Sequence, residues 1–200
     1  MDSQAIRYLE SNLLLHIPLL DPLQRGQVEI LSASGEGVLL REKLSGTYLI
    51  SAENPEYGVS LLKLIPPDSL LMACQEHFVH SAAEILGLNT VHACYQAVYL
   101  SKEKAVYEPH LLIRKPSAEE LAIIQQTYKM LSEDELTKLN DRGELYGGFE
   151  GEHFAGFIGR HREGSIGLLE VFPEYRRHGC GMELESFMVN KTLEEGRIPF

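Results

Sequence analysis

The spacing of apolar residues in the first half of the chain predicts alternating helices and strands. Apolar positions at helical spacing begin at Ile6 and end at Pro18. Residues 28–42 and 47–52 are typical of strands around a glycine turn, and residues 69–75 of a buried strand. The pattern then predicts a helix over 77–88 and a strand over 90–100, whereas residues 57–65 fit either a helix or a strand.

The second half has clearer helix starts and turns. Ser117 and Ser132 each precede a glutamate by three residues, which is a capping box opening a helix. The pattern further predicts strands over 110–115 and 165–173, a hairpin over 144–161, a helix over 182–195 and the start of a strand over 197–200. A charged segment over 101–108 ends in proline and predicts a linker, so we expect an N-terminal α/β region over 1–106 and a second domain over 107–200.

Composition and charge narrow the class of protein. With 44% apolar and 24% charged residues, the chain is an ordinary globular sequence. Its net charge of −11 argues against a nucleic-acid partner. The three cysteines follow no disulfide framework, the N-terminus lacks the features of a signal peptide, and no apolar stretch is long enough to span a membrane. We therefore expect a cytoplasmic protein without a membrane partner.

The segment YRRHGCG, residues 175–181, follows a predicted strand and precedes a predicted helix. A glycine-rich loop in this place turns successive backbone N–H groups toward an anion, and the helix dipole adds to the attraction. Arg176 and Arg177 would add charge-assisted contacts. The loop has neither the Gly-Lys-Ser/Thr of a Walker loop nor the three glycines of a Rossmann fingerprint. The sequence therefore predicts an anion site of another kind.

The pattern V-x-P-x-x-R-R-x-G-x-G over residues 171–181 resembles the signature loop of the GNAT superfamily of acyl-CoA N-acyltransferases, and the resemblance covers about residues 107–200. It implies a mixed, mostly antiparallel sheet with flanking helices, acetyl-CoA as co-substrate, and a bulge in the strand before the loop. It also implies that the backbones of Leu169 and Val171 pair with pantetheine. Pyrophosphate-binding N–H groups would come from Arg177, His178, Gly179, Cys180, Gly181 and Met182, with Arg176 at the leading Gln/Arg position of the motif.

Glu170 is the carboxylate that we expect to act as the catalytic base. Regular alternation would place it on an apolar face with Ile166, Leu168 and Phe172, where burial would raise its pKa. The alternative is that the bulge turns it toward solvent or a structural partner. His161 and Glu163 are further candidates, acting through water. We expect Cys180 to be a bystander, because the resemblance implies direct transfer from thioester to amine.

The chain departs from the family pattern at its end. Phe200 lies inside the expected fifth strand, so the tyrosine that often protonates the thiolate is missing. Residues 69–100 resemble the missing half, so the N-terminal region is interpreted as a degenerate GNAT-like half that packs beside the fourth strand, with Tyr95 and Tyr99 as distant substitutes. A second copy of the chain in that place, or a truncated form of a longer protein, are the alternatives. The leucine cluster at 13–19 is interpreted as core or as a homodimer contact.

We therefore expect an α/β (α+β) protein that transfers an acetyl group from acetyl-CoA to a primary amine of a small molecule or peptide in a ternary complex. The alternative is a non-catalytic acyl-CoA-binding or regulatory module. The identity of the amine stays open, because acceptor sites are built from variable loops. No metal is expected, since Cys74, His77 and His80 do not share one helical face.

Overall fold

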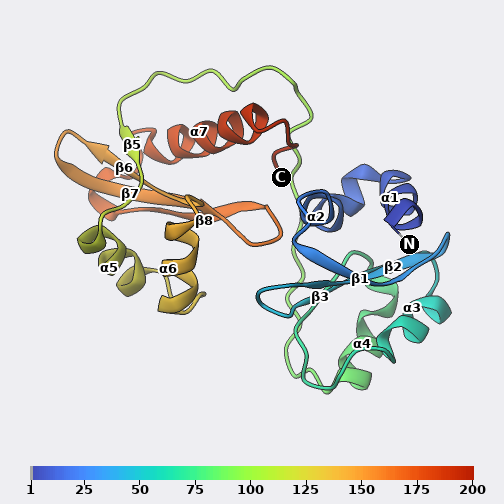
Figure 1. Cartoon of the computed structure of the whole chain (residues 1–200). Helices are drawn as coiled ribbons and strands as arrows, with labels where there is room; N and C mark the ends of the chain where they lie inside the picture. Colours follow the sequence, from blue (N-terminus) through green and yellow to red (C-terminus); the bar gives the residue numbers. More distant parts are fainter. Residues whose placement is uncertain (1) are drawn as a thin grey trace. The chain divides into compact units, whose positions relative to one another are not determined.

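The computed structural model describes residues 2–200 and consists of two compact units, which divide between Gln96 and Ala97 (Figure 1). Each unit is an α+β structure built on a four-stranded, mostly antiparallel sheet with helices against it. The sequence therefore predicted the fold class.

Unit 1 begins with two helices, followed by a sheet. Its elements are α1 (Asp2–Glu10), α2 (Leu13–Gln24), β1 (Val28–Ala33), β2 (Gly37–Glu42), β3 (Tyr48–Ala52), α3 (Pro55–Leu62), β4 (Leu71–Ala73), the 3-10 turn η1 (Glu76–Phe78) and α4 (Val79–Leu86). The sheet order is β1-β2-β3-β4, and β4 runs parallel to β3. α1 and α2 pack on one face, where Leu9 and Leu19 are buried, while α3 and α4 pack on the other face, where Leu62 and Phe78 are buried (Figure 1).

Unit 2 repeats part of this plan and begins with an additional strand. Its elements are β5 (Leu112–Arg114), α5 (Ala118–Thr127), α6 (Glu133–Asp141), β6 (Leu145–Glu150), β7 (His153–Arg160), β8 (Ile166–Val171), the 3-10 turn η2 (Pro173–Tyr175) and α7 (Cys180–Glu194). The sheet order is β5-β6-β7-β8, and all its pairs are antiparallel. Both predicted capping boxes form at Ser117 and Ser132. α5 and α6 cover one face of the sheet and α7 covers the other.

The segment between the two sheets does not form the strand predicted over residues 90–100. Residues from Ala97 onward associate with unit 2 instead. Tyr99 N–H donates to Pro199 O at 2.9 Å, and Ala105 N–H donates to Asn190 Oδ1 on α7 at 2.7 Å. These bonds explain why the division between the units falls before the predicted boundary at residue 106.

The two units share one order of elements, namely two helices, three antiparallel strands and a helix. In unit 1, Tyr48 N–H at the start of β3 donates to Leu70 O, just before the parallel strand β4, at 2.9 Å. In unit 2, Ile166 N–H at the start of β8 donates to Phe200 O at 2.6 Å. Residue 200 therefore lies where unit 1 begins its parallel strand, although residues 197–200 do not themselves form the strand predicted there. The repeat covers α1 to α3 of unit 1, whereas β4 and α4 have no counterpart among the described residues of unit 2. It therefore precedes residues 69–100, where the sequence indicated a resemblance to the missing half.

One glycine in each sheet occupies an equivalent position on the second of the three antiparallel strands. Gly37 on β2 pairs with Ala52, and Gly156 on β7 pairs with Val171. A Cβ on Gly37 would lie 2.5 Å from Ser51 O, and a Cβ on Gly156 would lie 2.3 Å from Glu170 O. Each glycine is therefore required by the close approach of the next strand, and Ser51 and Glu170 hold equivalent places in the repeat.

The helices of both units are short, and α7 has 15 residues. None of the helices formed by residues 2–200 combines the length and apolarity that crossing a membrane would require.

Candidate functional site at the end of β8

A β-bulge interrupts β8 at Leu168. Gly159 pairs with Gly167 and Phe157 pairs with Glu170, so that two residues of β8 stand opposite the single residue Ile158. Leu168 takes a left-handed φ of +52°. Its side chain is buried, whereas that of Leu169 is 40% exposed. β8 is the edge strand of this sheet, so the bulge lies on a strand that has a ladder partner on one side only beyond Ile166.

The bulge separates residues that regular alternation would place on one face. Ile166 packs with the core under α7, whereas Leu168 and Phe172 pack with the core under α5 and α6. The expected apolar face shared by Ile166, Leu168 and Phe172 is therefore wrong. The side chain of Glu170 is 34% exposed, and it finds a charged partner. Of the two alternatives for Glu170, the structure favours the one in which the bulge turns it toward a structural partner.

That partner is Arg176, the first arginine of the glycine-rich loop. Its Nη2 donates to Glu170 Oε1 at 2.8 Å, and its Nε donates to Val171 O at 2.7 Å. The guanidinium is thus folded back along β8, although its side chain stays 54% exposed. Arg176 links the loop to the strand that precedes it.

The loop ends in a helix whose first turn has no side-chain cap. Arg177 and Gly179 both take left-handed φ angles, of +68° and +89°, and α7 begins at Cys180. Gly179 is the N-cap residue; its carbonyl accepts from Glu183 N–H at 3.0 Å. The N–H groups of Cys180, Gly181 and Met182 precede this first helical bond and therefore have no acceptor within the helix. Such a terminus attracts an anion through both its free N–H groups and the helix dipole.

The side chains around this terminus divide into exposed and buried groups. Arg177, His178 and Met182 are exposed, and Met182 is 71% exposed. Cys180 is 5% exposed, and burial, followed by the nearby charge of Glu150, raises the pKa of its thiol. A thiol with a raised pKa is a poor nucleophile at neutral pH, which supports the bystander role expected for Cys180.

Glu183 is a residue of this region that the sequence did not indicate. It lies in the first turn of α7 and is 3% exposed. Its carboxylate accepts the backbone N–H groups of His110 and Leu111, at 3.0 and 2.9 Å, and also lies 3.3 Å from His110 Nδ1. Glu183 therefore holds the segment before β5 against α7 and fixes the helix that carries the loop. Its partners lie more than seventy residues away in the chain, so no local pattern could reveal them.

The corresponding junction of unit 1 has none of these features within the described residues. β3 pairs with β2 without a register shift, and it has 5 residues where β8 has 6. Only Glu53 and Asn54 separate β3 from α3, against residues 172–179 in unit 2. Asn54 Oδ1 accepts from Tyr57 N–H at 2.8 Å, and Pro55 supplies no N–H group. The helix that would receive the anion in unit 1 is therefore capped by its own chain.

The remaining candidates from the sequence do not converge on this junction. Tyr99 Oη donates to Glu103 O at 3.0 Å, and the Tyr95 side chain is fully exposed. His161 packs against Gly167, and Glu163 accepts from Ser165 Oγ.

Cys74, His77 and His80, the residues considered for a metal site, lie in unit 1. Burial raises the pKa of Cys74 to about 12, and His80 lies beside Glu84. Residues 2–200 contain no group of three or more His, Cys, Asp or Glu side chains arranged to hold a metal.

Comparison with known proteins identifies the fold but no family. No protein-family model matches this chain, and no curated protein matches it. Among solved structures, the chain is similar to the X-ray structure of a Drosophila protein determined by a structural genomics consortium, with a TM-score of 0.61 and 15% sequence identity. That match covers 100% of this chain and 86% of the other. The chain therefore shares its α+β fold with this Drosophila protein.

Proposed function

We propose that unit 2 binds acetyl-CoA at the β8–α7 junction and transfers its acetyl group to a primary amine of a small molecule or peptide. The observation that carries the proposal is the combination of a bulged edge strand, a loop with two left-handed residues and an uncapped helix terminus. Unit 1 is an internal comparison, because the same order of elements there has a regular strand, a short loop and a capped helix. The features expected of a CoA site are thus confined to the unit whose sequence resembles the GNAT loop.

In this proposal, the pyrophosphate lies at the start of α7. The N–H groups of Cys180, Gly181 and Met182 would donate to its oxygens, together with those of Arg177, His178 and Gly179 in the loop. Gly179 leaves room for such an approach, because no atom lies within 4 Å of the place where a Cβ would stand. The pantetheine arm would then follow β8, an edge strand, where backbone groups of Leu169 and Val171 would pair with its amides. The Val171 carbonyl now accepts from Arg176 Nε at 2.7 Å and would become available when Arg176 turns to the phosphate.

The transfer step joins the amine nitrogen to the thioester carbonyl carbon. A C–N bond forms, the C–S bond breaks, the ammonium intermediate loses a proton, and the thiolate of CoA accepts one. We assign Glu170 as the carboxylate that accepts the amine proton, because it lies on β8 directly between the two residues proposed to pair with pantetheine. The contact between Glu170 and Arg176 links CoA binding to proton transfer, because a phosphate that attracts Arg176 would release the Glu170 carboxylate.

The proposal is tested first by binding. Isothermal titration of the purified chain with CoA and with acetyl-CoA should show saturable binding. Arg177→Gln, which removes an exposed cation of the loop, should weaken it about tenfold. Lys115→Gln removes an exposed cation before α5 and is the matched control, whose affinity should stay unchanged. Absence of CoA binding, or equal losses in both variants, would refute the site.

The second test separates an enzyme from a binding module. Free CoA is measured as thiol release from acetyl-CoA against a panel of primary amines, small molecules and peptides. Amine-dependent release that falls in Glu170→Gln across the pH range supports transfer with Glu170 as the base. Binding of acetyl-CoA without release for any amine would identify a non-catalytic acyl-CoA-binding module. Full activity of Glu170→Gln at every pH would remove Glu170 from the chemistry.

A further inference from the structure

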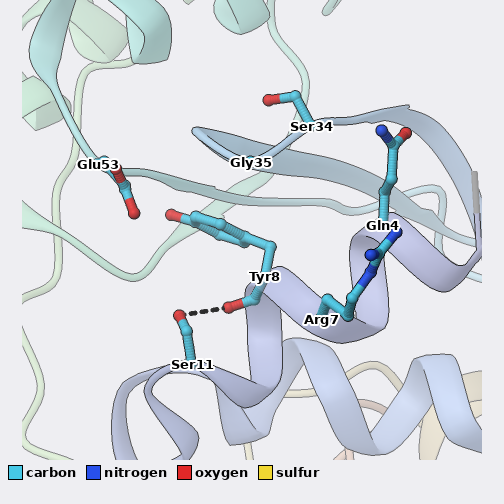
Figure 2. A pocket seen from close by; sticks show the side chains of 7 residues that line it. All are labelled: Gln4, Arg7, Tyr8, Ser11, Ser34, Gly35 and Glu53. Carbon is cyan, nitrogen blue, oxygen red and sulfur yellow. Dashed lines mark hydrogen bonds between the residues drawn. The ribbon is translucent and has the colours of Figure 1, made fainter.

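A pocket in unit 1 has a carboxylate at one end and a guanidinium at the other (Figure 2). Its volume is about 380 Å³, within the range of roughly 300–1,000 Å³ that is usual for small-molecule sites. Arg7 and Tyr8 come from α1, Ser34 from the turn after β1, and Glu53 from the residue directly after β3. Figure 2 shows the Tyr8 ring between Glu53 and Arg7, with the hydroxyl directed toward the Glu53 side.

Both charged groups have unused bonding capacity. The Glu53 carboxylate forms no hydrogen bond or ion pair with the described side chains and backbone of the chain. Arg7 donates through Nε to Ser3 O at 3.1 Å, and its two terminal nitrogens have no acceptor among the same residues. The buried Arg160 guanidinium, by contrast, contacts both Glu144 and Glu195. The pocket therefore offers one anion and one cation to a ligand.

The wall between the two charges is held by a buried polar network. Tyr8 Oη lies 3.0 Å from Ser51 Oγ, which also lies 2.8 Å from His16 Nε2 and accepts from Gln75 Nε2 at 2.8 Å. Ser51 is fully buried and His16 is 2% exposed. Because α1, α2, β3 and the residue before η1 meet in this network, the Tyr8 wall is fixed before a ligand arrives, which lowers the cost of binding.

The network leaves Glu53 and Arg7 as the charges that a ligand meets. Burial raises the pKa of Tyr8 and lowers the pKa of His16, so both groups are neutral at pH 7. The pocket also adjoins the α3 terminus, which Asn54 already caps, and Glu53 itself would repel phosphates. A nucleotide or a second CoA therefore does not fit this pocket, whereas a ligand with separated opposite charges does.

We propose that this pocket binds a small zwitterion, whose ammonium group pairs with Glu53 and whose carboxylate pairs with Arg7. Gln4, Ser11 and Ser34 supply polar groups around the two charges. The site lies wholly within unit 1 and does not depend on acyl transfer in unit 2.

A series of ω-amino acids measures both the binding and the spacing of the charges. The full chain is titrated with β-alanine, γ-aminobutyrate and ε-aminocaproate, with butyrate and butylamine as ligands that carry one charge each. We expect one chain length to bind best, and to bind at least about tenfold tighter than either singly charged ligand, because each charge-assisted contact contributes about that factor. Glu53→Gln and Arg7→Gln should each lower the affinity for this ligand about tenfold.

Glu29→Gln is the matched control. Glu29 is an exposed carboxylate on β1 of the same unit, and its replacement changes the net charge by the same amount as Glu53→Gln. The affinity of Glu29→Gln for the best ω-amino acid should equal that of the unchanged chain. The proposal is overturned if no ω-amino acid binds at millimolar concentration, if butylamine or butyrate binds as tightly as the best ω-amino acid, or if Glu53→Gln and Glu29→Gln lose the same affinity.

Discussion

The Arg176 guanidinium lies on the Glu170 carboxylate, with Nη2 2.8 Å from Oε1, and on the carbonyl of Val171, with Nε 2.7 Å from the oxygen. The contact joins the first arginine of the glycine-rich loop to the bulged strand before it. Because an anion at the loop and Glu170 on the strand would compete for the same guanidinium, their occupancy is coupled.

Removal of the Glu170 charge should therefore strengthen binding of CoA. In Glu170→Gln, Arg176 is free to contact a phosphate, and we expect about fivefold tighter binding, or about 1 kcal/mol. In Glu170→Gln combined with Arg176→Gln this gain should disappear. Titration calorimetry measures both. Glu174 is an exposed carboxylate in the same loop, so Glu174→Gln controls for the loss of one negative charge. An equal gain in CoA affinity in Glu174→Gln would show that Arg176 is not involved.

The two ends of α7 offer a matched test of the anion site. Gly179 before the helix and Gly196 after it have φ angles of +89° and +73°, and neither has an atom within 4 Å of a Cβ position. Alanine at either position should lower the free energy of unfolding by about 1 kcal/mol, because L residues are strained in this conformation. Gly179→Ala should also weaken CoA binding about tenfold or more, whereas Gly196→Ala should leave it unchanged. Thermal unfolding and calorimetry measure the two effects, and equal affinities for CoA would argue against phosphate at this terminus.

Local signals in the sequence were sufficient for the helices that begin after Ser117 and Ser132 and for the loop before α7. They failed near the N-terminus, where the helix expected to end at Pro18 is two helices and α2 continues through Pro18 to Gln24. The capping boxes at Ser117 and Ser132 involve residues three apart, and the glycine pattern of residues 175–181 needs no distant partner. The strand predicted over 90–100 failed because strand-forming residues become a strand only where a sheet edge pairs with them. Tyr99 instead bonds to the C-terminal peptide at Pro199.

The bulge could be expected from the resemblance but not located from the residues. Leucine is an ordinary strand residue, and nothing in SIGLLEVFP marks Leu168 as the one with a positive φ. The environment of Glu170 depends on the conformation of Leu168. The prediction that Glu170 shares an apolar face with Ile166, Leu168 and Phe172 was therefore wrong. The sequence indicated a related half only through residues 69–100, whereas units 1 and 2 share the order of elements from α1 to α3 and a pair of glycines, which form no recognisable sequence pattern.

Reactivity of the three cysteines should follow their burial. Cys94 is exposed, Cys180 is buried with a raised pKa, and the pKa of Cys74 is raised to about 12. Iodoacetamide at neutral pH should therefore modify Cys94 first, and Cys94→Ser should leave a chain that is alkylated only slowly. Mass spectrometry of the folded and the urea-unfolded chain gives the order. Rapid labelling of Cys180 in the folded chain would instead indicate an activated thiol and would reopen a covalent role for it.

The buried guanidinium of Arg160 makes the stability of unit 2 dependent on pH. It is 2% exposed and donates to Glu144 at 2.7 Å and to Glu195 at 2.6 and 2.8 Å. Burial alone would raise the pKa of Glu195, but its bonds to Arg160 and the charge of Arg197 bring it down to about 2.

An unfolded glutamate has a pKa of about 4.3, so the pair with Arg160 stabilises unit 2 fully above that pH and is lost as the pH falls toward 2. Since Glu195 is a third exposed, we expect a contribution of about 1 kcal/mol rather than the full value of the shift. Urea unfolding between pH 6 and pH 2.5 should show this loss, and Glu195→Gln should be less stable at pH 6 with a flatter dependence below about pH 4. Glu185→Gln, an exposed carboxylate on the same helix, should keep the slope of the unchanged chain. If Glu195→Gln retains that slope as well, the acid sensitivity of unit 2 arises from other carboxylates and the Arg160–Glu195 pair contributes little to folding.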